Sequence, residues 1–317
     1  MMAIMRNHLS AETAASALIC LGLVATAARS FEPRILESVV SVLPEWPDHA
    51  GRGEAPEGSA VAVMEGGYLA TNDHVLGDAT RVEVRLADGR LAPAEIVGRD
   101  RPTDIALIKI EADLPVLPPA PEPGLGDPVC AVSNQFGLGL SVTCGVVSAV
   151  RRTGVGFNPI EDFIQTDAVA NPGGSGGALV DGQGRLVGMI SAIFTKESDA
   201  NIGVNFATSL PLVMRVTEDL KAHGRVIRAR SGLRVEALSP AERRRLVGVR
   251  VRRTTPGGPA ERAGLKPGDV ITAVGGRRIR RPSDVTSAIQ LHRVGDSVPV
   301  DYRRDGAPGR ASLILAK

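Results

Sequence analysis

Short apolar runs bounded by Gly, Pro, Asn or Asp fill the chain between about residues 58 and 207. These runs are rich in Val, Ile and Leu and are too short for helices, which favours β-strands separated by turns. The clearest runs are 61–63, 82–86, 129–132, 142–150, 186–190 and 204–206. Strands at this regular spacing predict an all-β architecture built from barrels.

One helix follows these strands. Its apolar positions recur at helical spacing, at Leu212, Val213, Val216 and Leu220. Ser209 is expected to cap the first turn, Pro211 suits a position near the start, and Gly224 is expected to end the helix. This helix closes the domain that begins at residue 58, so we expect one domain over 58–224 and a second over 225–317.

Three residue types used in nucleophilic catalysis stand at the edges of strand-like runs. His74 follows the run 68–70, Asp104 precedes the run 105–110, and Ser175 lies among the glycines of 173–177. The chain order His, Asp, Ser is that of the chymotrypsin-type triad. In that chemistry Ser175 attacks a carbonyl carbon, His74 takes its proton, and Asp104 holds the imidazole and stabilises its cation.

Around these residues the chain resembles the HtrA-type (Deg-type) serine proteases over about residues 35–224. The similar blocks are 58–59, 71–75, 103–107, 136–139, 163–167 and 171–179. The resemblance implies a mainly β fold, with a chymotrypsin-like double β-barrel of six strands each and the triad in the cleft between the barrels. It also implies an oxyanion hole at Gly173, Gly174 and Ser175, in which Gly173 and Ser175 supply the N–H groups.

The site departs from this family at two places. Gly174 stands where Asn is usual, and the segment 133–136 reads Ser-Asn-Gln-Phe where Gly-Asn-Pro-Phe is usual. Because Gly adds backbone freedom, Gly174→Asn is expected to restrict the loop and raise activity. By alignment Ala170 and Ile193 line the pocket for the residue before the cut. No Asp falls there, so small or medium apolar side chains are expected rather than Lys or Arg.

Residues 225–317 resemble a small α+β PDZ domain of the HtrA type, through the run 259–271 and a helix expected over 282–291. PDZ domains bind an extended peptide as an added strand. The resemblance places Leu233, Arg234 and Val235 at the peptide site, with Arg234 where Gly is usual. This domain has 21 Lys and Arg against 8 Asp and Glu, whereas residues 1–224 have 16 against 27. The excess suggests docking on the acidic domain, or binding of acidic peptides or anionic lipid.

The N-terminus suggests export. Residues 17–28 have the length of a secretory apolar region, and Ala25-Thr26-Ala27 fits a cleavage site, so residues 1–28 are expected to be a signal peptide. An uncleaved membrane anchor is the alternative. The segment 29–57 corresponds in the family to one that helps three protease domains meet, which implies a homotrimer.

Removal of the signal leaves two cysteines, Cys130 and Cys144. They face each other if their strands pair about Gly137, and an oxidising location permits a disulfide. Two free thiols are the favoured expectation, because cross-strand neighbours often have poor disulfide geometry. The His residues are scattered and no Cys-x-x-Cys occurs, so neither a metal nor another cofactor is expected.

These features together predict an exported, periplasmic serine endopeptidase that cleaves misfolded or unfolded envelope proteins under control of its PDZ domain. Unfolded proteins, PDZ-bound peptides and copies of the chain are the expected partners, and nucleic acid is not. Two alternatives stay open. One is a peptide-binding or chaperone-like protein with an inactive protease domain, and the other is a membrane-anchored regulatory protease.

Overall fold

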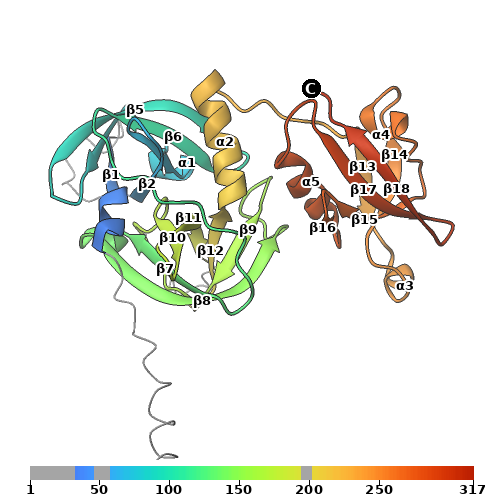
Figure 1. Cartoon of the computed structure of the whole chain (residues 1–317), viewed down its shortest axis with the longest axis horizontal. Helices are drawn as coiled ribbons and strands as arrows, with labels where there is room; N and C mark the ends of the chain where they lie inside the picture. Colours follow the sequence, from blue (N-terminus) through green and yellow to red (C-terminus); the bar gives the residue numbers. More distant parts are fainter. Residues whose placement is uncertain (1–32, 46–57, 194–201) are drawn as a thin grey trace, which may run out of the picture. The chain divides into compact units, whose positions relative to one another are not determined.

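The computed structural model describes residues 33–45, 58–193 and 202–317. The expected signal peptide at 1–28 lies outside these residues, as does most of the expected oligomerisation segment. The described chain is mostly β-strand, with a long helix in the middle and a small mixed domain at the C-terminal end (Figure 1).

Six antiparallel strands close the first barrel in the order β1-β2-β3-β6-β5-β4. They are β1 Val39–Glu45, β2 Gly58–Met64, β3 Tyr68–Thr71, β4 Arg81–Arg85, β5 Leu91–Asp100 and β6 Ile105–Ile110. The short helix η1 (Pro33–Ser38) precedes β1, and the single-turn helix α1 (Asp73–Leu76) follows β3. Aliphatic side chains such as Val40, Leu69 and Ile108 fill the interior, which explains the alternating and apolar runs of the sequence.

The second barrel repeats this plan in the order β10-β11-β12-β9-β8-β7. Its strands are β7 Pro128–Ser133, β8 Ser141–Arg152, β9 Phe163–Thr166, β10 Ala178–Asp181, β11 Leu186–Ile193 and β12 Asn205–Ser209. The short helix η3 (Gln135–Gly137) joins β7 to β8. The expected pair of six-stranded barrels is therefore confirmed.

Helix α2 (Leu210–His223) follows the second barrel and packs against strands of both barrels. Its end is as predicted, because Gly224 adopts the left-handed conformation with φ 66° and its N–H bonds to Leu220. Ser209 is the N-cap residue, as predicted, but its side chain makes no capping hydrogen bond. The Ser209 hydroxyl donates instead to the carboxylate of Asp162 at 2.6 Å. A hydrogen bond to a carboxylate is stronger than one between the hydroxyl and a neutral backbone group.

The C-terminal domain is a sheet in the order β13-β14-β15-β17-β18, in which β13 is an edge strand. Its elements are β13 Leu233–Ala237, α3 Pro240–Arg243, β14 Val249–Thr254, α4 Pro259–Arg262, β15 Val270–Val274, β16 Arg277–Arg278, α5 Pro282–Gln290, β17 Ser297–Arg304 and β18 Ala307–Ile314. Helix α5 matches the helix expected over 282–291. The core of this domain is separate from those of the barrels.

The favoured expectation of two free thiols is wrong. Cys130 of β7 and Cys144 of β8 form a disulfide. The register pairs them directly, as the predicted turn about Gly137 requires, and their Cα atoms lie 4.0 Å apart. Direct pairing brings the two sulfur atoms within bonding reach, which spacing along the sequence alone did not establish.

The stability of the C-terminal domain is expected to depend on pH through Asp269, whose side chain is 1% exposed. Burial raises the pKa of this carboxyl, but hydrogen bonds from Arg304 and from the Lys266 N–H outweigh burial and lower the pKa on balance. A carboxyl with a lowered folded-state pKa stabilises above its unfolded pKa of about 3.9, and this contribution is lost as pH falls through the folded pKa.

We therefore expect Asp269→Asn to lower the free energy of unfolding at pH 7 by about 1–3 kcal/mol, with a smaller difference below about pH 4. Urea titrations across this pH range measure the effect. The matched control is Asp305→Asn, because Asp305 is an exposed turn residue of the same domain. A loss at pH 7 that persists undiminished at pH 3 would contradict the assignment.

Candidate functional site

His74 is carried by α1, and Arg99 of β5 fixes this short helix. The Arg99 guanidinium donates to Asp73 Oδ1 at 2.5 Å and to the Gly77 carbonyl at 2.7 Å. A single helical turn has little stability of its own. The hydrogen bonds from the guanidinium therefore stabilise this single turn in place of further helical turns, and they hold the backbone from which His74 projects.

Asp104 faces His74 across the end of the first barrel. Its Oδ2 lies 2.7 Å from His74 Nδ1, and its Oδ1 accepts the His74 backbone N–H at 2.9 Å. The backbone of Asp104 is left-handed, with φ 56°, a strained conformation that surrounding contacts must maintain. The Asn72 side chain supplies one such contact by donating to the Asp104 carbonyl at 2.8 Å. This geometry orients the imidazole, so that Nε2 is the ring nitrogen turned away from the carboxylate.

Ser175 lies in the turn between β9 and β10, where Gly173 and Gly176 have φ of 87° and 88°. The Ser175 hydroxyl donates to the Ser191 carbonyl at 3.3 Å. Within the described residues it makes no hydrogen bond to His74. The structure thus brings all three predicted residues to the junction of the barrels, with the serine hydroxyl turned toward Ser191.

The backbone around Ser175 offers free donors. Gly174 N–H donates to the Asn171 carbonyl at 2.8 Å, whereas the N–H groups of Gly173 and Ser175 have no acceptor among the described residues. Two unpaired N–H groups, one of the serine itself and one two residues before it, are the kind of donors that an oxyanion requires.

Ser59 of β2 holds this turn, a role that the similarity at 58–59 did not indicate. Its N–H donates to the Ser175 carbonyl and its hydroxyl donates to the Gly173 carbonyl, both at 2.8 Å. Its hydroxyl also accepts the Asn134 N–H at 3.0 Å. Ser59 thus holds the carbonyl groups on both sides of Gly174 and fixes the backbone of the turn.

Gln135, which stands where the family usually has Pro, has a structural role. Its side chain is buried, accepts from the Asn171 amide at 2.8 Å and donates to the Val169 carbonyl at 3.0 Å. A Pro side chain has neither group. Gln135 therefore braces the turn that precedes Ser175 from the β7–β8 side.

Comparisons with known proteins agree with these observations. Residues 58–189 match the model of the trypsin-like peptidase domain, and residues 213–315 match that of the PDZ domain. The periplasmic serine endoprotease DegP of Escherichia coli K12 is 37% identical over 268 residues, which cover 81% of this chain and 56% of DegP. The serine endoprotease DegS of the same organism is 36% identical over 259 residues, covering 78% of this chain and 73% of DegS.

Among solved structures, the HtrA-type protease AlgW with tripeptide superposes with a TM-score of 0.69 at 36% identity, over 89% of this chain and 94% of that one. The chain belongs to the HtrA-type serine protease family. It spans little more than half the length of the DegP relatives that it matches.

The HtrA-type substrate pocket is only partly described. Ala170 is buried beside the turn that carries Ser175. Ile193 is the last residue of β11, and its side chain lies outside the described part of the structure. Whether these two residues line the pocket stays a prediction.

The PDZ peptide-site residues lie at the start of β13. Leu233 and Val235 pack against the domain core, and Arg234, which alternates with them, is exposed. Gly232, just before the strand, has φ 70° and forms the turn that starts it. Arg234 therefore lies on the face of β13 opposite the two apolar side chains.

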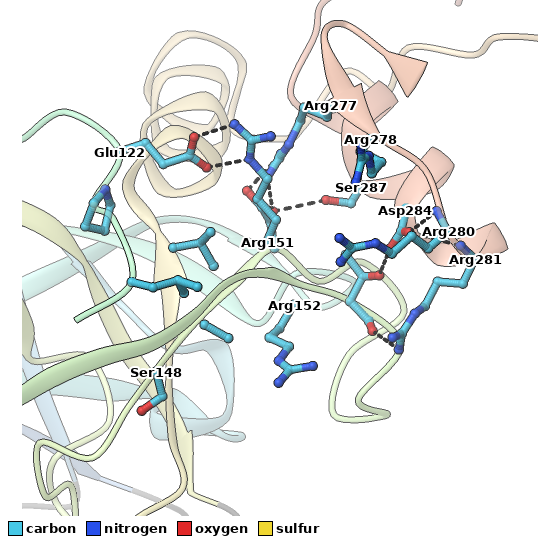
Figure 2. Close-up of a pocket in the computed structure, with 16 residues that line it drawn as sticks. Glu122, Ser148, Arg151, Arg152, Arg277, Arg278, Arg280, Arg281, Asp284 and Ser287 are labelled. Atoms are coloured by element: carbon cyan, nitrogen blue, oxygen red, sulfur yellow. Dashed lines mark hydrogen bonds and ion pairs between the residues drawn. The ribbon is translucent and has the colours of Figure 1, made fainter. Parts of the chain in front are cut away.

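Hydrogen bonds link the second barrel to the PDZ domain. The buried Asp162 carboxylate receives Arg277 at 2.6 Å from Nη2 and 3.1 Å from Nη1, and Ser287 of α5 at 3.3 Å. Figure 2 shows Arg277 and Ser287 beside Arg151, which pairs with Glu122. The hydrogen bond from Arg151 lowers the pKa of Glu122, so this carboxylate is charged at neutral pH.

A cavity of about 500 Å³ opens at this junction, lined by six Arg residues of β8, β16 and the loop before α5 and by three acidic residues. It does not include the residues of the triad.

The described part of the chain contains no helix that is long and apolar enough to cross a membrane.

The structure reverses the expectation for Gly174→Asn. A β-carbon at this position would lie 2.8 Å from the Asn171 carbonyl oxygen, a backbone atom that now accepts the Gly174 N–H. The turn must shift to admit any side chain, which displaces the donors of Gly173 and Ser175. We expect Gly174→Asn and Gly174→Ala to lower kcat about tenfold or more with little change in KM.

Turnover of a short peptide substrate measures this effect, with Gly182→Ala as the control. Gly182 lies beyond β10, and a β-carbon there would meet only Pro128, at 3.8 Å. Equal or higher kcat for Gly174→Asn would show that the turn accepts the residue usual in the family.

Proposed function

We propose that the protein is a serine endopeptidase, in which His74, Asp104 and Ser175 are the catalytic residues and Gly173 and Ser175 form the oxyanion hole. The observation that carries the proposal is the pairing of His74 Nδ1 with Asp104 at 2.7 Å on the same junction that presents the two free N–H donors. The names of the relatives, periplasmic serine endoprotease and serine endoprotease, support the same activity.

Each of these residues has one role in the proposed reaction. Rotation of the Ser175 hydroxyl from Ser191 toward His74 lets Nε2 take the proton as Ser175 Oγ attacks the scissile carbonyl. Asp104 stabilises the imidazolium, and the N–H groups of Gly173 and Ser175 receive the oxyanion. His74 then gives its proton to the leaving amine, and water, activated by the same imidazole, releases the acyl group from Ser175. No step requires a cofactor.

The proposed substrates are unfolded or misfolded proteins of the bacterial envelope, cut after small or medium apolar residues. The half-exposed imidazole of His74 leaves the site open to an extended chain. The periplasmic relatives and the N-terminal pattern support the proposed export of the chain to the periplasm. We further propose a homotrimer assembled through the segment 29–57, with protease and PDZ domains at 58–224 and 225–317.

Control by the PDZ domain is part of the proposal. Arg277 and Ser287 bind Asp162, which precedes β9 in the second barrel, and Asp284 accepts the Thr153 hydroxyl at 2.5 Å. A peptide that binds the PDZ domain and shifts Arg277, Ser287 or Asp284 changes these contacts, and through them the position of the loop 153–162 of the protease domain.

One observation favours a second function, peptide binding without cleavage. The Ser175 hydroxyl is bonded to Ser191 rather than to His74. If this rotamer persists with a substrate in place, the protein is a chaperone-like peptide binder.

A cleavage assay separates the two functions. Ser175→Ala and His74→Ala are each expected to lower kcat on unfolded casein by about 10⁴-fold or more, since members of a triad act as a unit. Both variants are expected to keep the thermal unfolding midpoint, because neither side chain belongs to a core. The control is His223→Ala, at the exposed end of α2. Unchanged cleavage by either site variant contradicts the mechanism, and the absence of cleavage by the native protein favours the peptide binder.

A further inference from the structure

The edge strand β13 carries a concentration of positive charge at one point. In the register of β13 with β14, Leu233 pairs with Thr254, Arg234 with Arg253, and Val235 with Val251. Arg252 is therefore the extra residue of a β-bulge, in which two residues of one strand oppose one of the other. Three arginines thus occupy neighbouring positions beside the free edge of the sheet. We call Arg234, Arg252 and Arg253 the arginine bulge.

These three side chains are exposed and unpaired. Among the described residues, none of them makes an ion pair or a side-chain hydrogen bond. Other arginines of the domain differ, because Arg250 binds Glu242 and Arg304 binds Asp269. Like charges directly opposite each other on two strands are destabilising. The arginine bulge therefore lacks the counter-charge that its neighbours have.

The position of the bulge determines which ligand can supply this charge. The outer side of β13 has no strand beside it, so a peptide can add there by backbone hydrogen bonds. Side chains of the added strand alternate between the two faces of the sheet, and those on one face lie about 4.5–5.5 Å from the opposite residue. A peptide side chain on the face of Arg234 thus comes within reach of the arginine bulge.

We propose that β13 binds an extended peptide C-terminus with an apolar last residue and an acidic penultimate residue, and that the arginine bulge binds this acidic side chain. The apolar last residue belongs on the face of Leu233 and Val235, which pack against the core. Alternation then places the penultimate side chain on the face of Arg234. The inference rests on the peptide-binding part of the proposed function and not on catalysis.

Glu236 restricts the preference for an acidic side chain to the penultimate position of the peptide. It lies on β13 two residues after Arg234, on the same face, and pairs in register with Arg250. A peptide antiparallel to β13, with its carboxylate at the turn before the strand, brings its penultimate residue near Arg234 and its earlier outward residue near Glu236. An acidic side chain at the earlier position therefore does not contact the arginine bulge and does not raise the affinity of the peptide.

The test measures binding of fluorescent peptides to the full chain carrying Ser175→Ala, so that no peptide is cleaved. Three peptides share one apolar C-terminus and carry Glu at the penultimate position, Glu two residues earlier, or Gln at both. At low salt we expect the first to bind about three- to tenfold more tightly than the third, and the second to bind no better than the third. The advantage is expected to fall to less than about twofold at 0.5 M salt, because the arginines are exposed.

Charge variants attribute the preference to the arginine bulge. Arg234→Gln combined with Arg253→Gln is expected to abolish the advantage of the first peptide. Arg303→Gln combined with Arg310→Gln, an equal charge change on β17 and β18, is the matched control and is expected to retain it. Arg234→Glu with Arg253→Glu is expected to prefer a penultimate Lys, a reversal that misfolding cannot produce.

Equal affinity for the three peptides, or binding of none of them, overturns the proposal without bearing on cleavage. Tighter binding after Arg234→Gln also overturns it, since Arg234 would then obstruct the peptide. Vesicles containing phosphatidylglycerol are titrated in parallel. Loss of vesicle binding in the double Gln variant, with no discrimination among peptides, would assign the arginine bulge to an anionic membrane surface instead.

Discussion

The two barrels meet where the backbone of β2 lies against the turn that carries Ser175. Ser59 N–H donates to the Ser175 carbonyl, and a β-carbon on Gly176 would lie 1.9 Å from the Ser59 carbonyl oxygen. Only a residue without a side chain fits there, and its φ of 88° also favours glycine. This close approach fixes Ser175 relative to the first barrel, which carries His74 and Asp104. The alignment of the site across the two barrels thus depends on this backbone contact.

The sequence predicted that the three candidate residues adjoin strands, and the site lies at strand ends. His74 and Asp104 could be recognised because each adjoins an apolar run, and Ser175 because its glycines are unusual. The residues that support them could not. Ser59 binds Asn134, 75 positions away, and Asn72 donates to Ser191, 119 positions away, at 3.3 Å. Contacts across such distances follow from barrel closure, which no local pattern of residues records.

The expectations that the structure changes have the same origin. The Cys130–Cys144 pairing was predicted correctly from the turn, but the bond itself depends on how close the two strands bring the sulfur atoms. Ser209 is a good helix cap by residue type, and it binds Asp162 because the tertiary fold places a carboxylate within its reach. For Gly174, similarity to relatives indicated a missing side chain, whereas the structure shows that the space for one is absent.

The central claim is that Ser175 is a nucleophile activated by His74 and Asp104. Reaction of the native protein with a fluorophosphonate, followed by mass spectrometry of its peptides, tests the claim directly, because such probes modify a serine only when it is activated. We expect one adduct per chain, located on Ser175, with labelling slowed by several orders of magnitude in His74→Ala. No adduct in the native protein, an adduct on another residue, or unchanged labelling of Ser175 in His74→Ala would contradict it.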